Sequence, residues 1–184
     1  MVRTRLLSEA NRIQSALEQG ELLILDGAIG SEIKRLRGDM DATAWCGLAN
    51  RDHPDVVREV HAGYLRAGAN IVTANTFATC RHVLAPSGAA ADAPAISAAG
   101  VRLCREAIDL VAPERPVAVA GSMSNQMAWI PGTFSPDPRY APSPVDESAN
   151  YREYAEALAE AGADMLLLEM MQDITHASRL AEAA

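Results

Sequence analysis

Hydrophobic residues recur along the chain in two alternating patterns, one with the spacing of amphipathic helices and one of short, continuous apolar runs. The first helical pattern covers Leu6 to Leu17 and stops before Gly20, and a wholly apolar strand is predicted over Leu22 to Leu25. The same order then returns. Helices are predicted over 53–67, 93–111 and 148–161 and from 174 onward, and strands over 71–75, 117–120 and 165–168. The pattern therefore predicts four β-α units after one extra helix.

Repeating β-α units build a parallel sheet, because each helix returns the chain to the same end of the sheet. The sheet is either doubly wound or closed into a (β/α)8 barrel. In both architectures the functional groups gather at the carboxyl ends of the strands. The residues that follow the predicted strands are therefore the first candidates for a site.

Composition and charge narrow the class of ligand. The 184 residues are 49% hydrophobic and 22% charged, which is typical of a soluble globular domain. The formal net charge of −8 argues against nucleic acids and anionic membranes as partners, so a small molecule is the expected ligand. No apolar run has the length of a signal peptide or a membrane span, and the spacing of Cys46, Cys80 and Cys104 fits no disulfide framework. We expect reduced thiols and a cytoplasmic location.

Polar residues follow each predicted strand. Asp26-Gly27 follows the first, Asn75-Thr76 the second, Gly121-Ser122 the third and Glu169 the fourth. A phosphate ligand is disfavoured, because the Asp26 carboxylate would repel it and because no third glycine completes a dinucleotide fingerprint. Two acids at one edge of a sheet suit an amine. The alternative is structural, with Asp26 capping the following turn and Glu169 pairing with an Arg.

Three segments of the chain resemble the homocysteine S-methyltransferase family in order and spacing. They are Leu-Asp-Gly-Ala-Ile-Gly-Ser-Glu at 25–32, His-Pro-Asp-Val-Val-Arg-Glu-Val-His-Ala-Gly-Tyr-Leu-Arg-Ala-Gly-Ala-Asn-Ile-Val-Thr-Ala-Asn-Thr-Phe at 53–77, and Ala-Leu-Ala-Glu-Ala-Gly-Ala-Asp-Met-Leu-Leu-Leu-Glu at 157–169. The resemblance implies a TIM-barrel-like (β/α)8 fold, of which this chain would hold about four units. Residues 1–184 would form a single domain, the N-terminal half of a homocysteine-binding barrel with an N-terminal extra helix.

The resemblance also implies an activity and a site. The family moves a methyl group to the thiol of homocysteine, forming methionine, from a donor such as S-methylmethionine, S-adenosylmethionine, betaine or a folate- or cobalamin-bound methyl. By matching position, Asp26 and Glu169 would hold the substrate ammonium. The backbone at Gly27 and the strand end at Asn75 and Thr76 would position the rest of the amino acid, and Trp45 would line the donor side.

Zinc is expected from the resemblance, but its ligands are missing from this sequence. The family holds zinc with three cysteines, one after the sixth strand and a pair in a Gly-Gly-Cys-Cys motif after the eighth, and this sequence contains no such motif. A replacement site of Cys46, Cys80 and His82 is conceivable, although Cys is more often a small buried hydrophobe. Core or helix positions are expected for Cys104, His53, His61 and His176. No metal ligand and no catalytic residue are therefore predicted in this chain.

The segment from Ser122 to residue 147 departs from the family and is rich in Pro. It follows Gly121 with Ser-Met-Ser-Asn where the family has Ser-Ile-Gly-Pro, and it carries Trp129, Phe134 and Tyr140. A loop of this length is typical of a lid or a partner contact, with a plain surface loop as the alternative.

Four strands cannot close a barrel, so the edge strands and the interior face would meet water. We therefore expect the chain to self-associate, to pair with a second polypeptide that supplies the other half, or to be an N-terminal fragment. Three functions follow: a homocysteine S-methyltransferase completed by another half, a non-catalytic remnant that binds a small amino acid or acts as an interaction module, and an unrelated barrel lyase or isomerase. The last has no Lys or His at a strand end to act as a base.

Overall fold

The computed structural model describes residues 2–36, 41, 44–133, 135–171 and 173–184. Its sheet has three parallel strands in the order β1 (Ile71–Thr73), β2 (Ala118–Ser124) and β3 (Met165–Glu169). Ile71 is opposite Ala118 on β2, and Ala120 is opposite Met165 on β3. Because the strands are parallel and lie side by side, their carboxyl ends meet at one edge, as the sequence predicts.

The predicted first strand, Leu22 to Leu25, is not a strand among the described residues. Leu25 forms a single parallel bridge with Ile71, and the Asp26 amide donates to the Ile71 carbonyl at 3.0 Å. Leu22 is 88% exposed, so the segment lacks the packing that holds an apolar strand in a sheet. The half barrel of four strands is therefore not confirmed; the structure has a three-stranded sheet with a bridge at its β1 edge, in a partial TIM-barrel-like arrangement.

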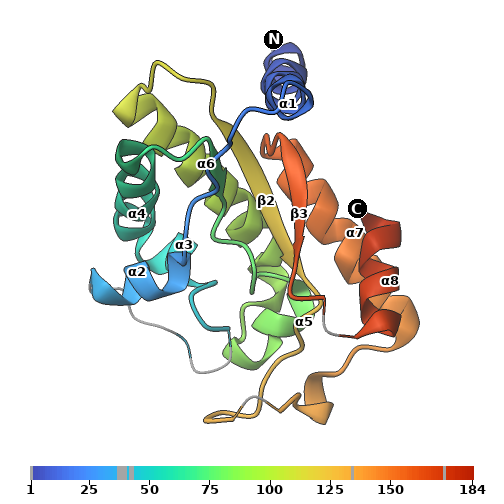
Figure 1. Cartoon of the computed structure of the whole chain (residues 1–184). Coiled ribbons are helices and arrows are strands. Elements are labelled where there is room, and N and C mark those ends of the chain that lie inside the picture. The colour runs from blue at the N-terminus through green and yellow to red at the C-terminus, as the bar shows by residue number, and fades with distance from the viewer. Residues whose placement is uncertain (1, 37–40, 42–43, 134, 172) are drawn as a thin grey trace.

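Helices pack side by side on one face of the sheet (Figure 1). The long ones are α4 (Pro54–Ala67), α6 (Ala93–Val111), α7 (Pro144–Glu160) and α8 (Ile174–Ala183). The prediction of 93–111 is confirmed in full. The seventh helix begins four residues before the predicted Ser148, because Pro144 suits the first helical turn and the Ser143 hydroxyl accepts from the Asp146 amide.

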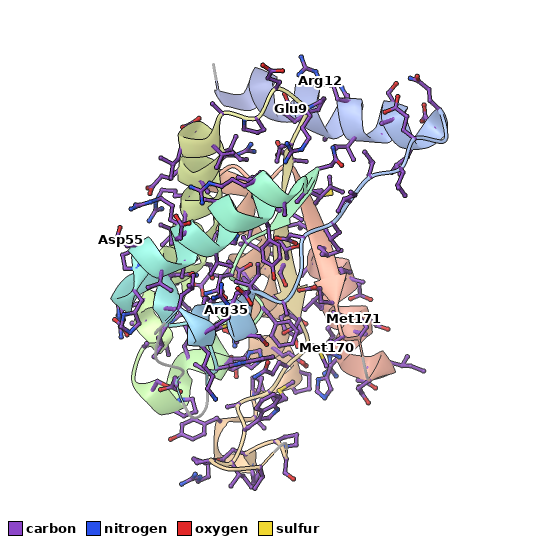
Figure 2. The ribbon with its side chains drawn as sticks, turned by 60° about the vertical axis from the view of Figure 1, so that its left-hand side comes forward. Glu9, Arg12, Arg35, Asp55, Met170 and Met171 are labelled. Atoms are coloured by element: carbon purple, nitrogen blue, oxygen red, sulfur yellow. The ribbon has the colours of Figure 1, made fainter. Side chains whose placement is uncertain are left out.

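The other elements are short or lie at the ends of the sheet. The predicted extra helix is α1 (Val2–Glu18), and it lies near the amino end of β2, across the top of the molecule in Figure 2. Three short helices were not predicted: α2 (Ile29–Arg35), α3 (Ala49–Asp52) and α5 (Arg81–Leu84). Single 3-10 turns are η1 (Ala85–Ser87), η2 (Ala90–Asp92) and η3 (Pro138–Tyr140). No helix in the described ranges is long and apolar enough to cross a membrane.

The hydrophobic core lies between the sheet and the helix layer. The sheet contributes Val72, Val119 and Met123, and the helices contribute Leu65, Val101, Cys104, Tyr151, Leu158 and Leu180, all buried. Gly121 has a packing role, because a Cβ at this position would lie 3.1 Å from the Leu158 side chain. β2 is buried along its whole length, whereas β3 is only half-buried, so the sheet is less well covered on the β3 side.

The predicted long loop after Gly121 is shorter than expected. Ser122, Met123 and Ser124 continue strand β2 and pair with β3, and α7 begins at Pro144. The Ser124 hydroxyl donates to the Phe77 carbonyl at 2.7 Å, which joins the end of β2 to the segment after β1. The departure from the family pattern at these residues therefore lies within a strand and does not form a turn.

Candidate functional site

A cavity of about 310 Å³ opens at the carboxyl ends of the strands. Four of the five predicted substrate-binding residues line it, namely Asp26, Gly27, Asn75 and Glu169. Met170, labelled in Figure 2, lies at its rim, away from α1. Parallel strands bring residues from three distant parts of the sequence to one place, as expected for this fold.

Asp26 is held by Thr73 on the neighbouring strand. The Thr73 amide donates to Oδ2 at 2.8 Å, and the Thr73 hydroxyl donates to Oδ1 at 2.7 Å. Burial nevertheless raises the pKa of Asp26 to about 6, and the nearby charge of Glu169 contributes in the same direction. A cation bound in the cavity would reverse this effect by favouring the ionised carboxylate.

Glu169 ends strand β3 and faces the same cavity. One of its carboxylate oxygens accepts a hydrogen bond from the Ser122 hydroxyl on β2. In the part of the chain that the structure describes, neither Glu169 nor Asp26 forms an ion pair. The structural alternative for these acids, a turn cap and an Arg pair, is therefore not what their described contacts show.

Asn75 is buried and joins the strand end to the loop before α3. Its amide nitrogen donates to the Cys46 carbonyl and to Asn50 Oδ1, both at 2.9 Å. Asn50 in turn donates to the Asn75 carbonyl at 2.7 Å and to the Ile96 carbonyl at 3.1 Å. These bonds hold the Cys46 segment against the cavity, so Asn75 supports the wall of the cavity as well as lining it.

Thr76 and Gly27 have packing roles that the sequence did not predict. Thr76 is fully buried, does not line the cavity, and donates its hydroxyl to the Ser122 carbonyl at 2.8 Å. A Cβ at Gly27 would lie 2.9 Å from the Tyr64 hydroxyl, so this glycine leaves room for the end of the Tyr64 side chain. The role of both residues in substrate binding stays a prediction.

A second cavity of about 600 Å³ adjoins the first and shares Trp45, Phe77 and Met170 with it. Trp45 meets the Phe77 ring edge-on with centroids 6.0 Å apart, and the Trp129 ring lies 6.5 Å from Trp45. The remaining wall is formed by Asn125, Gln126, Met127, Pro136, Asp173 and His176. Trp45 is therefore at the boundary between the two cavities, and its expected place beside the donor stays a prediction.

The residues present do not fit a zinc ion. In the described ranges, no group of three or more His, Cys, Asp or Glu side chains lies close enough together to hold a metal. Cys46 donates to Asn75 at 3.0 Å, and Cys80 Sγ lies 3.5 Å from His82 Nδ1, so the two thiols have separate partners. The conceivable replacement site of Cys46, Cys80 and His82 is therefore not formed, and Cys104 is a core residue as predicted.

Comparisons with known proteins agree with the family resemblance of the three sequence segments. The family model described as homocysteine S-methyltransferase matches residues 23–184. The homocysteine S-methyltransferase of Escherichia coli is 30% identical over 181 residues, which are 96% of this chain and 58% of that protein. The methionine synthase of Mycobacterium tuberculosis is 31% identical over 160 residues, which are 83% of this chain and 13% of that protein.

Solved structures agree with the fold. The metallated form of the Escherichia coli homocysteine methyltransferase MmuM matches with a TM-score of 0.73 and 26% sequence identity, over 91% of this chain and 60% of that one. The apo form of the same enzyme matches with a TM-score of 0.63. This chain therefore spans somewhat more than half the length of the E. coli relative.

Proposed function

Since this chain belongs to the homocysteine S-methyltransferase family, we propose that it binds homocysteine and contributes to methyl transfer to the thiol of that amino acid, which forms methionine. One observation carries the proposal: Asp26 and Glu169, two carboxylates without an ion-pair partner among the described residues, line the same small cavity. The other expected functions require different chemistry at this place. An unrelated lyase or isomerase would need a base at a strand end, and the cavity wall contains no Lys or His.

The ammonium group of the substrate would lie between Asp26 and Glu169. Its charge would offset the repulsion between the two carboxylates and the burial that raises the pKa of Asp26. The backbone at Gly27 and Asn75 borders the same cavity, which supports a role for this backbone in positioning the amino-acid carboxylate. Binding would therefore depend on charge neutralisation inside a half-buried site.

The methyl donor would enter from the second cavity. Trp45 and Phe77 separate the two cavities, so a donor beyond them would face the substrate side chain. Trp129 and Pro136, which pair in an isolated antiparallel bridge, form part of the outer wall. This position supports a lid function for the segment between β2 and α7, rather than a plain surface loop.

A second candidate function is amino-acid binding without turnover. This candidate would hold if no further segment supplied the zinc ligands that the family uses. Zinc would supply a deprotonated, metal-bound thiol, whereas a free thiol with a pKa near 8.5 is only about 3% ionised at pH 7. Zinc analysis of the purified protein and a turnover assay with homocysteine separate the two candidates.

The amino-acid site is tested by calorimetry with homocysteine. We expect Asp26→Asn and Glu169→Gln each to weaken binding about tenfold or more, because each removes one charge from the ammonium site. Asp109→Asn and Glu160→Gln are matched controls, since both acids are exposed and lie outside the cavity, and both should bind as the wild type does. Unchanged affinity in both site variants would contradict the ammonium assignment.

We also propose that a second polypeptide covers the open side of the sheet, either another copy of this chain or a segment that completes the barrel. Large apolar side chains are exposed near the β1 edge and near the end of β3: Leu22, Ile24, Leu25 and Met170. Such a surface favours association. The expected single domain over 1–184 and the cytoplasmic location stay predictions from the sequence.

A further inference from the structure

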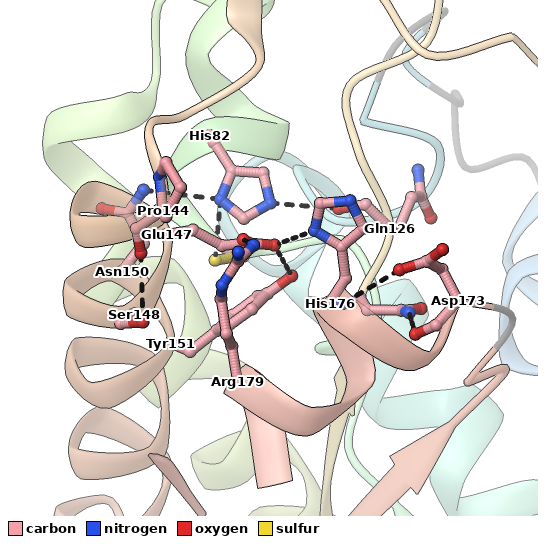
Figure 3. Close-up of polar contacts among 12 residues, drawn as sticks. His82, Gln126, Pro144, Glu147, Ser148, Asn150, Tyr151, Asp173, His176 and Arg179 are labelled. Carbon is pink, nitrogen blue, oxygen red and sulfur yellow. Dashed lines mark hydrogen bonds and ion pairs between the residues drawn. The ribbon is translucent and has the colours of Figure 1, made fainter. Parts of the chain in front are cut away.

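Gln126, in the wall of the second cavity, has a fixed main chain and an unpaired side chain (Figure 3). Its backbone amide donates to the Ser124 hydroxyl at 3.3 Å, and its carbonyl accepts from His82 Nε2 at 3.1 Å. The residue is 8% exposed, and neither the oxygen nor the nitrogen of its side-chain amide has a hydrogen-bond partner among the described residues. A buried amide without partners costs free energy, which a bound polar group would recover. Gln126 is therefore held in place for a ligand that carries both a hydrogen-bond donor and an acceptor.

Asp173 gives the same cavity a negative charge. It caps the first turn of α8, where its Oδ1 accepts from the His176 amide at 3.0 Å. This backbone hydrogen bond lowers the pKa of Asp173, so its carboxylate is ionised at neutral pH. The Asn125 side chain donates to the Asp173 carbonyl at 3.4 Å, which joins the start of α8 to the segment that carries Gln126. An acid and an unpaired amide in one cavity favour a ligand whose hydrogen-bond donor is positively charged, such as an ammonium group.

The boundary between the two cavities is apolar and has a strained backbone. Trp45, Phe77 and Met170 line both cavities. The backbone φ is 48° at Trp45 and 51° at Met170, in the left-handed region that costs free energy for residues other than glycine. Strained residues of this kind cluster at ligand-binding sites, and the faces of aromatic rings attract methylated cations. The boundary therefore suits the positively charged, methyl-bearing centre of a ligand.

These features distinguish between classes of methyl donor. A betaine has no N–H group to donate to the side-chain oxygen of Gln126, and Asp173 would repel the carboxylates of a folate. An α-amino acid fits both residues. Its ammonium can donate to the Gln126 oxygen and interact with Asp173, and its carboxylate can accept from the Gln126 nitrogen. S-methylmethionine and S-adenosylmethionine both carry this end on a sulfonium, whose positive charge suits the aromatic boundary.

We propose that Gln126 and Asp173 are specificity-determining residues, which bind the α-amino-acid end of a sulfonium methyl donor in the second cavity. The proposal rests on the proposed function, since homocysteine must occupy the first cavity for the donor to meet it at Trp45 and Phe77. The sulfonium then lies at the boundary, with the homocysteine side chain on the other side. Neither Gln126 nor Asp173 takes part in the bond changes, because both contact only the end of the donor that does not react.

Calorimetry on the protein saturated with homocysteine tests this proposal, because homocysteine then blocks the first cavity. The probes are S-methylmethionine, S-adenosylmethionine, betaine and methyltetrahydrofolate. We expect a sulfonium amino acid to bind, and betaine and methyltetrahydrofolate to bind about tenfold or more weakly, since each leaves a buried polar atom of Gln126 unpaired or faces the charge of Asp173. The separate titrations of the two sulfonium compounds identify which of them supplies the amino-acid end.

Variants of both residues connect this binding to the cavity. Gln126→Met keeps the length of the side chain but removes both polar atoms, and it should weaken the sulfonium ligand about tenfold or more. Asp173→Asn can still cap α8 and should weaken the ligand about threefold, because the acid is exposed. Gln14→Met and Asp109→Asn, at exposed residues outside both cavities, are the matched controls. Gln126→Glu should reverse the preference: it accepts from the ammonium but repels the carboxylate, so it should favour the same sulfonium without its carboxylate.

Homocysteine titrations confirm that each variant folds and keeps the first site. If homocysteine binds but neither sulfonium amino acid does, or if Gln126→Met binds them as the wild type does, the inference is overturned and the proposed function is not. A preference of the wild type for betaine or methyltetrahydrofolate also overturns the inference alone. Absence of homocysteine binding in the wild type would overturn the proposed function, and this inference with it.

Discussion

Thr73 donates two hydrogen bonds to Asp26, one from its amide and one from its hydroxyl, and so holds this carboxylate, which follows the isolated bridge at Leu25, against β1. Despite these bonds, burial raises the pKa of Asp26 to about 6, since the half-buried site disfavours its charge. A cation bound beside Asp26 would therefore lower its pKa and stabilise the ionised carboxylate.

The pH dependence of homocysteine binding follows from this pKa. If the ammonium requires an ionised Asp26 with a pKa of about 6, the affinity falls about tenfold between pH 7 and pH 5, as the carboxylate becomes protonated. Calorimetry at both pH values measures this. Glu169→Gln should keep the dependence and Asp26→Asn should lose it; an affinity that rises on acidification would contradict the assignment.

Thr73→Val should weaken binding through Asp26. The substitution keeps the shape and the amide bond but removes the hydroxyl that donates to Oδ1, so the pKa of Asp26 rises further and less of it is ionised at pH 7. We expect a loss of affinity of about threefold at pH 7, which becomes small at pH 8 as the carboxylate ionises again. Thr133→Val, at an exposed threonine outside both cavities, is the control.

Gly27→Ala should destabilise the fold by about 1–3 kcal/mol, because the added methyl group would overlap the Tyr64 ring. Tyr64→Phe removes the hydroxyl, which is the atom nearest to the new Cβ at 2.9 Å. The double variant should therefore recover part of the loss. Urea denaturation of the four proteins in a double-mutant cycle gives the coupling, and strict additivity would show that the two residues do not interact.

Asn50→Ala should destabilise the protein by about 1–3 kcal/mol, since the buried Asn75 carbonyl loses its side-chain donor and the Asn75 amide keeps only its bond to the Cys46 carbonyl. Homocysteine affinity should fall as well, because Asn75, which holds the Cys46 segment, loses the bond to Asn50 that fixes its side-chain amide. Chemical denaturation measures the first effect and calorimetry the second. Asn11→Ala, on the exposed side of α1, should change neither.

His61 should make the protein sensitive to acid. The residue is fully buried on α4, its ring nitrogens have no hydrogen-bond partner in the described part of the chain, and burial lowers its pKa from 6.5 to about 4. The folded state therefore favours the neutral ring: its contribution to stability is complete above pH 6.5 and is lost as the pH falls toward 4. The loss is about 3 kcal/mol.

Unfolding free energies of the wild type and of His61→Leu, measured between pH 7 and pH 4, test this prediction. The wild type should lose more stability than the variant over this range. His53→Gln replaces a histidine that is not buried and should keep the wild-type slope. Parallel slopes for the wild type and His61→Leu would show that another group controls acid unfolding.

Size-exclusion chromatography with light scattering tests whether a second copy of the chain covers the open side of the sheet. We expect self-association that depends on concentration, because Leu22 is 88% exposed and Leu25 and Met170 are about half exposed. Leu22→Lys should shift the equilibrium toward smaller species, whereas Leu110→Lys, at an exposed leucine on α6, should not. A stable monomer at every concentration would contradict self-association.

The local pattern of the sequence was sufficient for the long helices and for the three strands of the sheet. The spacing of apolar residues over 93–111 matches helix α6, since an amphipathic helix needs only a face toward a core. The same kind of reasoning failed for Leu22 to Leu25, because an apolar run becomes a strand only where a neighbour covers it, and Leu22 is exposed. Ser122 and Ser124 are polar but belong to β2, because the neighbouring strand β3 lies beside them and pairs with both.

Some features of the candidate site follow from the sequence, and others depend on the tertiary structure. Parallel topology by itself places Asp26, Asn75 and Glu169 at one edge, so the sequence alone predicted that these three residues lie close together, and all three line the first cavity. Only the tertiary structure decided that Thr76 is fully buried outside this cavity. It also decided that Glu147 contacts His176, which is 29 residues further along the chain. Contacts of this kind arise from the packing of α7 against α8, which no periodicity in either helix records.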